Sequence, residues 1–339
     1  MTNFRIKTIY AFSLLGLLFL ITLISVINAI NEKKVLCATI SQPLVVTNFQ
    51  KTNQEPITLM FVGDIMLDRG VEFMIKKYGN GDYKWTFSKI IDDLKQVDIL
   101  FGNLESPISD KGIKVGSIYS FRADPKTIEG LTYAGFDVLS VANNHIFDYS
   151  REAMEDSFKK LKEAGISYIG GGFDEKEAHS PVIKVIRGTK IAFLAYTNLG
   201  IENWVAKERK SGISWLSEVN LKKDISDAKN QADLVIVSMH FGEEYQAQPD
   251  FKQKYFARLA IDSGADLIIG HHPHVVQPIE KYKEGYIAYS LGNFIFDQGF
   301  SEETMKGLLL EILVENGKII EVAPRDIKIN KFFQPELVD

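Results

Sequence analysis

The chain has 339 residues, of which 45% are apolar and 24% are charged, a balance typical of one large globular domain or two small ones. The formal net charge of −5 leaves no basic field along the chain, which argues against a nucleic-acid partner. The single cysteine, Cys37, excludes an intrachain disulfide framework and a cysteine-rich metal site. Any metal ion must therefore be held by His, Asp, Glu and Asn side chains.

The N-terminal segment differs from the rest of the chain. Residues 9–30 carry no charge and, at about 1.5 Å per residue, can cross a hydrocarbon core of roughly 30 Å. Arg5, Lys7 and the amino terminus precede this run, which favours an N-terminus inside the cell and the remainder outside. We therefore predict a single-pass anchor over residues 1–31 in the lipid bilayer of the cell membrane, with the domain on the extracytoplasmic side.

Two other interpretations of this segment are weaker. A cleaved signal peptide would end at the poor cleavage site formed by residues 27–29, and the apolar run is long for a signal peptide. Lipidation of Cys37 is disfavoured because Leu36 directly precedes it and lysines separate it from the apolar run. Both the anchor and the signal-peptide interpretation place residues 35–339 outside the cytoplasm.

Beyond a polar linker predicted over residues 32–56, short apolar runs alternate with amphipathic segments, which is the pattern of an α/β fold. The candidate strands are residues 57–63, 97–102, 136–142, 166–171, 233–242 and 266–270. We predict one domain over residues 57–330 and a C-terminal tail over residues 331–339.

Glycines and turn dipeptides mark the ends of the expected elements. Three helix-like segments end at a glycine, the residue that adopts a left-handed conformation without steric cost: Gly135, Gly165 and Gly264. Residues 181–197 predict a hairpin that turns at Arg187-Gly188, and Asn316-Gly317 suits a type I′ turn near the C-terminus. The α/β units thus come first, and antiparallel strands follow.

Polar side chains follow five candidate strands at the point where each strand ends. They are Asp64, then Asn103 and Glu105, then Asn144 and His145, then His240, and finally His271, His272 and His274. Ligands bind at the carboxyl ends of strands in open α/β sheets, so we expect these side chains to meet at one edge. Carboxylates, Asn carbonyls and imidazoles suit one or two divalent ions such as Mn, Zn, Fe or Mg.

The sequence His272-Pro273-His274 places two imidazoles two residues apart. Along an extended segment such side chains lie on the same side, so we expect them to share a site. Each candidate has a simpler explanation when taken alone: Asp64 or Glu105 could cap a helix, and Asn144 could serve a turn. Their coincidence at five strand ends is what predicts a metal site.

Six blocks of the sequence resemble the CapA/PgsA family of poly-γ-glutamate capsule synthesis proteins over about residues 57–300. They are GDIMLDR (63–69), GNLESPIS (102–109), ANNHIFDY (142–149), HFGEEY (240–245), GHHPHVVQ (270–277) and SLGNFIFD (290–297). That family is similar in fold to the calcineurin-like metallophosphatases, so the resemblance implies a four-layer αββα sandwich. The block NHIFD is also similar to the NHEFD block of the 5′-nucleotidases in that superfamily.

The resemblance implies a role for each matching residue. The implied metal ligands are Asp64, Asn103, Glu105, Asn144, His240, His272 and His274, with His271 as a neighbour. His145 would be a general acid, and the Asp148 carboxylate would orient its imidazole and raise its pKa. Met66 stands where the superfamily has a histidine, and Asn103 stands where it has an aspartate, so Glu105 or Asp68 would have to compensate.

Several further residues are candidates for binding substrate. Arg69 and Arg122 could clamp an anion, because guanidinium forks suit phosphate and carboxylate, although each could equally be a solvated arginine. Asn143 would shape the turn beside the site, and the residues that follow His240 would line the pocket. Those residues are Glu243, Glu244 and Tyr245.

The resemblance implies a role in synthesis or export of a poly-γ-glutamate capsule, beside a membrane-bound synthase or ligase and integral-membrane subunits. The bound molecule would be a polyanionic polymer or a phosphate ester. Three classes of function compete: a metal-dependent phosphoesterase, a non-catalytic polyanion-binding or export subunit, and a structural scaffold. His145 with Asp148 favours the first, Met66 and Asn103 favour the second, and the intact histidines speak against the third.

Overall fold

The computed structural model describes residues 44–45, 55–115 and 118–338. The anchor predicted over residues 1–31 and most of the linker predicted over residues 32–56 lie outside these ranges. Within the described ranges, no helix is long and apolar enough to cross a membrane.

The first sheet has nine strands and is built around β2. Its strands, in spatial order, are β1 (Leu44–Val45), β16 (Lys318–Ile329), β15 (Lys306–Glu315), β2 (Ile57–Ile65), β3 (Ile99–Leu104), β4 (Phe136–Ser140) and β5 (Ser167–Ile169), with β14 (Asn293–Ile295) beside β2 and β17 (Pro335–Leu337) beside β16. The strands from β2 to β5 run parallel, and β15 and β16 add antiparallel pairs. Strand β17 lies in the segment predicted as a tail, and β1 in the predicted linker.

The second sheet has six strands and a parallel centre. Its order is β12 (Ile279–Tyr282), β13 (Gly285–Ala288), β11 (Leu267–His271), β10 (Leu234–His240), β8 (Thr189–Thr197) and β7 (Val182–Ile186). Strands β8, β10, β11 and β13 are parallel, whereas β7 and β12 pair antiparallel at the two edges. A third sheet has two antiparallel strands, β6 (Gly171–Gly172) and β9 (Gly212–Ile213).

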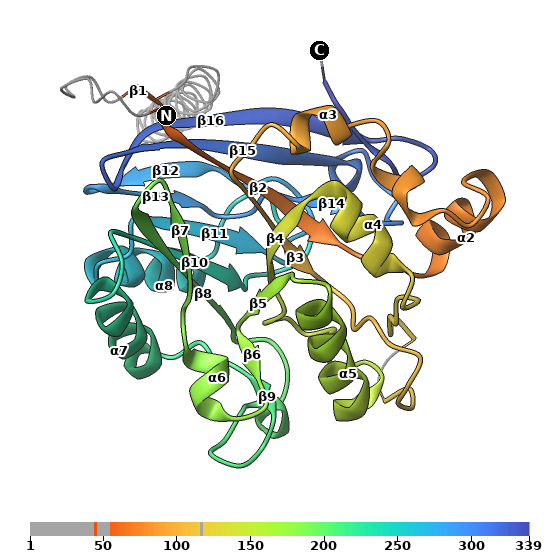
Figure 1. The fold of residues 1–339 in the computed structure, drawn as a ribbon, viewed down its shortest axis with the longest axis horizontal. Helices are drawn as coiled ribbons and strands as arrows, with labels where there is room; N and C mark the ends of the chain where they lie inside the picture. The colour runs from red at the N-terminus through yellow and green to blue at the C-terminus, as the bar shows by residue number, and fades with distance from the viewer. Residues whose placement is uncertain (1–43, 46–54, 116–117, 339) are drawn as a thin grey trace, which may run out of the picture. The chain divides into compact units, whose positions relative to one another are not determined.

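The helices cover the outer faces of the two sheets, and Figure 1 shows α7 and α8 on one side and α2, α4 and α5 on the other. The helices are α2 (Arg69–Tyr78), α3 (Ile91–Leu94), α4 (Thr127–Ala134), α5 (Ser150–Glu163), α6 (Glu175–His179), α7 (Glu218–Lys229) and α8 (Phe251–Asp262), with short 3-10 turns η1 (Tyr83–Phe87), η2 (Glu202–Trp204) and η3 (Glu303–Met305). The predicted α/β class is confirmed, and the layers follow the order helices, sheet, sheet, helices.

The alternation of side chains along each strand produces these layers. In β2, Leu59 and Phe61 pack into the core between the sheets, whereas Met60 and Val62 pack against the helices on the outer face. In β10, Ile236 faces the other sheet, while its neighbours Val235 and Val237 face the α7 and α8 side. Because successive side chains of a strand point to opposite faces, each apolar strand serves two cores at once.

The expected turns form where the sequence predicts them. The helix-ending glycines Gly135, Gly165 and Gly264 have φ values of 88°, 77° and 111°, in the left-handed region. The hairpin dipeptides Arg187-Gly188 and Asn316-Gly317 also have positive φ at both residues, as a type I′ turn requires.

Gly63 has a separate, packing role. A Cβ atom at this position would lie 1.9 Å from the carbonyl oxygen of Gly292. The same carbonyl accepts a 3.0 Å hydrogen bond from the backbone N–H of Asp64. The close approach therefore sets the position of the first polar residue at the end of β2.

The packing between the two sheets predicts how much a truncated core side chain lowers the free energy of unfolding. Phe101 is 0% exposed and stacks on Phe193 of the other sheet with ring centroids 6.1 Å apart. We expect Phe101→Ala to lower the free energy of unfolding by about 3–5 kcal/mol, because it removes buried area and leaves a cavity. The matched control is Phe73→Ala, at a side chain that is 55% exposed, where a change within about 0.5 kcal/mol is expected. Equal losses in the two variants, measured by urea unfolding, would contradict this account of the core.

Candidate metal centre

The polar residues predicted at the strand ends meet in one buried cluster. Asp64 pairs in register with Asn103 of β3, and His240 pairs in register with His271 of β11. The two sheets then contact each other at this edge, because Nδ1 of His271 lies 3.1 Å from Oδ1 of Asp64. The cluster thus combines donors from both sheets.

The spacing of these donors suits a small cation. Donor atoms about 2.1 Å from one ion and at right angles to each other are about 3 Å apart. Nε2 of His240 lies 2.7 Å from Oδ1 of Asn144, and Nε2 of His274 lies 3.5 Å from Oε1 of Glu105. Ligand atoms of Asp64, Glu105 and His240 all lie within 4.8 Å of one another.

Several buried atoms of the cluster have no hydrogen-bond partner among the described residues. They are Oε1 of Glu105, Nε2 of His271 and Nδ1 of His272. A buried polar atom without a partner costs about 1–3 kcal/mol, and a bound cation would satisfy such atoms. The residues present therefore fit a divalent metal ion.

The two buried carboxylates have opposite pKa shifts. Burial alone would raise the pKa of Asp64, but the adjacent imidazoles of His271 and His274 outweigh it and hold the pKa well below its usual range. Burial raises the pKa of Glu105 well above its usual range, and the negative charges of Asp64 and Glu244 add to this shift. A divalent cation between them would favour the ionised form of both carboxylates.

Burial also keeps two of the imidazoles neutral. Burial lowers the pKa of His240 well below its usual value, and the nearby His272 adds to the shift. Burial lowers the pKa of His272 to about 3, with His274 as the next contributor. Neutral imidazoles are the form that binds metal, so the protein matrix prepares both rings for ligation.

Three residues from the first two blocks take structural positions. Met66 is fully buried in the apolar core against the outer helices, and its sulfur accepts a hydrogen bond from the backbone N–H of Asp68. The Asp68 carboxylate accepts backbone hydrogen bonds from Arg69 and Arg122, and so caps α2. Asn103 directs its side-chain NH2 group at Asp64, 2.9 Å away, which is the orientation of a donor to the ligands.

The side chain of Asn143 is engaged by the protein itself. It is fully buried, donates to the carbonyl oxygen of Leu104 at 2.8 Å and to Oδ1 of Asn103 at 3.2 Å, and accepts from the backbone N–H of His145. It shapes the turn that separates Asn144 from His145. Asn144 contacts His240 in the buried donor cluster, whereas His145 contacts Asp148.

His145 is held with one nitrogen free for chemistry. Its Nδ1 lies 2.7 Å from Oδ2 of Asp148, and because a carboxylate can only accept, Nδ1 carries the proton. The backbone N–H of Phe121 donates to the same oxygen at 2.8 Å, and the Phe121 ring packs on the imidazole at 4.2 Å. Nε2 of His145 lies 3.8 Å from Oε1 of Glu105, so it faces the buried donor cluster.

The two candidate anion-binding arginines are engaged elsewhere. The Arg69 guanidinium forms an ion pair with Asp297 and lies over the Phe121 ring, 4.5 Å from its centroid. The Arg122 guanidinium donates to the carbonyl oxygen of Lys111 at 3.0 Å and stacks on Tyr149. Both side chains therefore hold neighbouring segments of the site in place.

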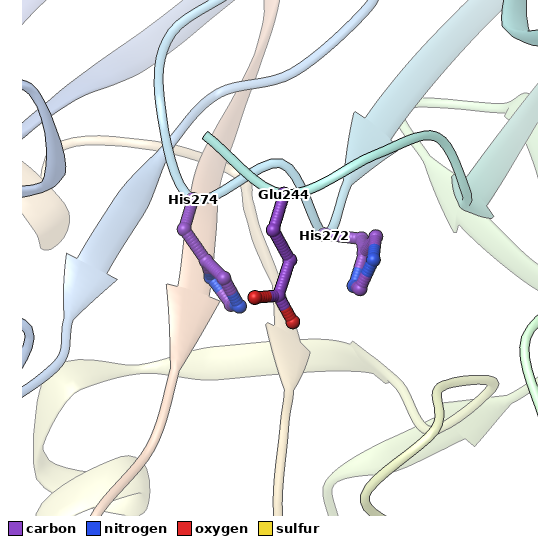
Figure 2. A group of neighbouring side chains, drawn as sticks. All are labelled: Glu244, His272 and His274. Carbon is purple, nitrogen blue, oxygen red and sulfur yellow. The ribbon is translucent and has the colours of Figure 1, made fainter. Parts of the chain in front are cut away.

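The loop after His240 supplies a carboxylate that the family resemblance did not imply as a metal ligand. Glu244 reaches His272 and His274, and Figure 2 shows its carboxylate between the two imidazoles. Glu243 and Tyr245 are exposed, and the Tyr245 hydroxyl accepts a hydrogen bond from Gln298 at 3.3 Å. The only signal in the sequence is the pair of glutamates after His240, and it does not say which one turns inward.

The backbone of His272-Pro273-His274 is not extended, contrary to the sequence prediction. His272 and His274 have φ values of 97° and 57°, a region that non-glycine residues rarely adopt. The two rings nevertheless lie 5.8 Å apart, centroid to centroid. Strained backbone of this kind costs about 1–3 kcal/mol per residue and concentrates at functional sites.

Comparisons with known proteins identify the family of this chain. Residues 58–298 match the profile of the family described as bacterial capsule synthesis protein PGA_cap. The chain belongs to this family. Capsule biosynthesis protein CapA of Bacillus anthracis is 37% identical over 289 residues, which cover 81% of this chain and 68% of that protein. PGA biosynthesis protein CapA of Bacillus subtilis (strain 168) is 33% identical over 279 residues, which cover 81% and 73%.

A solved structure supports the fold. A candidate 5′-nucleotidase of Staphylococcus aureus, determined in complex with α-ketoglutarate, is similar with a TM-score of 0.51 and 12% sequence identity. The likeness covers 83% of this chain and 54% of that one. At this level of identity the likeness shows a shared α/β architecture.

The low pKa of His272 predicts how stability depends on pH in metal-free protein. Between an unfolded pKa of about 6.5 and the folded pKa of about 3, the unfolded state binds more protons at this position. The free energy of unfolding should therefore fall as the pH is lowered from about 7 to about 4. His272→Gln removes this contribution, so the stability advantage of wild type over the variant should shrink across that window. The measurement is urea unfolding in excess chelator, and a constant difference between the two proteins would contradict the prediction.

Proposed function

We propose that this family member serves the synthesis or export of a poly-γ-glutamate capsule, and that its buried cluster is a divalent-metal centre with hydrolytic chemistry. The observation that carries the proposal is the placement of His145. Its Nδ1 is bound by Asp148 while its Nε2 faces Glu105 at 3.8 Å, which is the arrangement of a general acid beside a metal centre. A site that only binds a polymer needs no oriented acid.

The capsule role rests on the relatives. The family carries the description bacterial capsule synthesis protein, and the Bacillus subtilis relative is named a PGA biosynthesis protein. The family match over residues 58–298 includes the strand ends that form the cluster, and the identity to the Bacillus anthracis protein is 37% over 81% of this chain. We infer the same polymer, a dense polyanion, for this protein.

The chemistry follows from the donors present. A divalent ion bound by Asp64, Glu105 and the neighbouring imidazoles would supply Lewis-acid activation of a phosphoryl or carbonyl oxygen. Further ligands would be Asn144, His240, His272 and His274. His145 gives a proton from Nε2 to the leaving group, and the Asp148 carboxylate stabilises the imidazolium before that transfer. The backbone N–H of Phe121 fixes Asp148 in turn.

Charge makes the metal necessary for binding as well as for reaction. The chain carries a net charge of −5, and the buried cluster contains carboxylates but no lysine or arginine, so without metal it offers an anion no permanent positive charge. Asp297 offsets the charge of Arg69, and the Arg122 guanidinium is held by the Lys111 carbonyl oxygen and the Tyr149 ring. We therefore expect phosphate esters and polymer carboxylates to bind only when metal is present.

The proposed setting is the outer side of the cell membrane. Residues 1–31 would anchor the chain, and the folded domain would act beside a membrane-bound synthase or ligase and integral-membrane subunits. The apolar run over residues 9–30 supports the anchor, and the partners are inferred from the resemblance to the capsule synthesis family.

A second candidate function is a polyanion-binding subunit without turnover. Two observations favour it: Met66 lies in the apolar core, and Asn103 directs a donor at the ligands where a carboxylate would bridge two ions. Both functions require metal, and they differ in whether His145 has a role.

The first test compares metal content with turnover, in the full chain purified in detergent. Wild type should hold one or two divalent ions per chain and hydrolyse p-nitrophenyl phosphate. His272→Ala should lose ions because it removes a ligand. His145→Gln should keep the ions and lose about 100-fold or more in turnover, the range expected for a missing general acid.

His179→Gln is the matched control for that test. His179 also binds an aspartate through Nδ1, at 2.7 Å from Asp224, but it lies away from the metal cluster. The His179→Gln variant should retain its bound ions and its turnover. Wild type with metal but no turnover would replace the hydrolytic proposal by the polyanion-binding function, and wild type without metal would exclude both.

The capsule role is tested in cells from which the gene for this chain has been removed. Cell-associated polymer, measured as glutamate after acid hydrolysis, should disappear and return with the wild-type gene. His272→Ala should not restore it, whereas His179→Gln should. Undiminished polymer in the deletion strain would exclude the capsule role.

A further inference from the structure

The loop that follows β10 brings the Glu244 carboxylate to the two imidazoles of His272 and His274. Ligand atoms of these three residues lie within 4.8 Å of one another. The carboxylate lies between the rings, and all three side chains point into the same space (Figure 2). Glu244 is exposed whereas both histidines are buried, so this group of donors lies at the mouth of the cluster. The deeper group of Asp64, Glu105 and His240 is buried throughout.

The loop is held in place by the protein. The backbone N–H of Tyr245 donates to the carbonyl oxygen of Pro273 at 2.8 Å, which ties Glu244 to the His-Pro-His segment. The next residue, Gln246, accepts a 2.8 Å hydrogen bond from the buried Gln277 side chain. Tyr245 has a φ of 63°, in the left-handed region that side chains rarely adopt. Such strain is tolerated where the surrounding contacts impose it, so the inward position of Glu244 is a built feature.

Both imidazoles have a nitrogen available to a ligand at this position. Nδ1 of His274 lies 3.0 Å from Oδ1 of Asn293, which orients the ring and leaves Nε2 facing the cluster. This is the usual second contact of a metal-binding histidine. Nδ1 of His272 is buried and has no hydrogen-bond partner among the residues that the structure describes.

The Glu244 carboxylate adds a negatively charged ligand to a cluster that has few of them. Met66 is packed in the apolar core, and the Asn103 amide donates to Asp64, so neither supplies a negative ligand. Asp64 and Glu105 alone would leave two divalent ions with a net charge of about +2, and a third carboxylate lowers it to about +1. The remaining charge suits an anionic group of a substrate.

We propose that Glu244 is a metal ligand of this protein, and that with His272 and His274 it forms an outer cation position beside an inner position made by Asp64, Glu105 and His240. The inference rests on the metal centre proposed above. The outer ion is the weaker and more exchangeable one, because one of its three ligands is exposed. Its open side is where a phosphate or carboxylate group of the substrate binds.

The test measures Mn²⁺ binding to the full chain in detergent, by the electron paramagnetic resonance signal of free Mn²⁺. Wild type should bind two ions of unequal affinity. Glu244→Gln keeps the size of the side chain and removes its charge, so it should weaken the second ion about tenfold or more and leave the first unchanged. Glu243→Gln changes the adjacent glutamate, which belongs to neither donor group, and as the matched control it should bind Mn²⁺ like wild type.

Inorganic phosphate gives a second readout that needs no turnover. Phosphate should change the spectrum of Mn²⁺ bound to wild type loaded with two ions, and should leave Glu244→Gln loaded with one ion unchanged. Equal thermal unfolding of the metal-free proteins checks that the substitution leaves the fold intact.

The possible results separate this inference from the function on which it rests. Two ions bound with wild-type affinities by Glu244→Gln would overturn the role of Glu244. A single ion in wild type would overturn the division into inner and outer positions. So would the loss of both ions in Glu244→Gln but not in Glu243→Gln. Either result would still agree with a metal centre. No ion in wild type would remove the metal centre itself.

Discussion

The contact between Asp64 and the histidines of the second sheet is the constraint on which the site depends. Asp64 ends β2 in the first sheet, and His271 and His274 reach it from the second at 3.1 Å and 3.3 Å. These distances require both sheets to close over an apolar core, since a polar edge cannot hold them together in water. The stacked rings of Phe101 and Phe193 lie in that core. The apolar core between the sheets therefore holds Asp64 and the histidines within contact distance of each other.

The cluster is arranged at a cost to the metal-free protein. It buries carboxylates and imidazoles, leaves Glu105 Oε1 without a hydrogen-bond partner among the described residues, and holds His272 and His274 at positive φ. Each of these features opposes folding on its own. A bound cation would offset them together, because it would satisfy the unpaired atoms and balance the carboxylate charge. We regard this combination as the physical reason to assign function to the site.

Two histidine–aspartate pairs show how position decides role. His145 with Asp148 and His179 with Asp224 have the same 2.7 Å contact. The first pair follows β4 at the edge where the metal donors gather, and the second joins α6 to α7 on the outer face of the protein. The resemblance of the block around His145 identified the first pair, whereas His179 carried no comparable signal. An imidazole becomes a candidate acid only where its free nitrogen faces the reacting groups.

The sequence by itself determined the α/β class, the hairpin and helix-ending turns, and the strand ends at which most of the site residues stand. These features are local: side-chain alternation, left-handed glycines and the carboxyl ends of parallel strands follow from neighbouring residues. Only the tertiary structure decided that Met66 joins the core, that Asn103 acts as a donor, that the His-Pro-His backbone is strained, and that Glu244 rather than Glu243 turns inward. Those outcomes depend on register between strands and on hydrogen bonds between loops far apart in the chain, which no local pattern encodes.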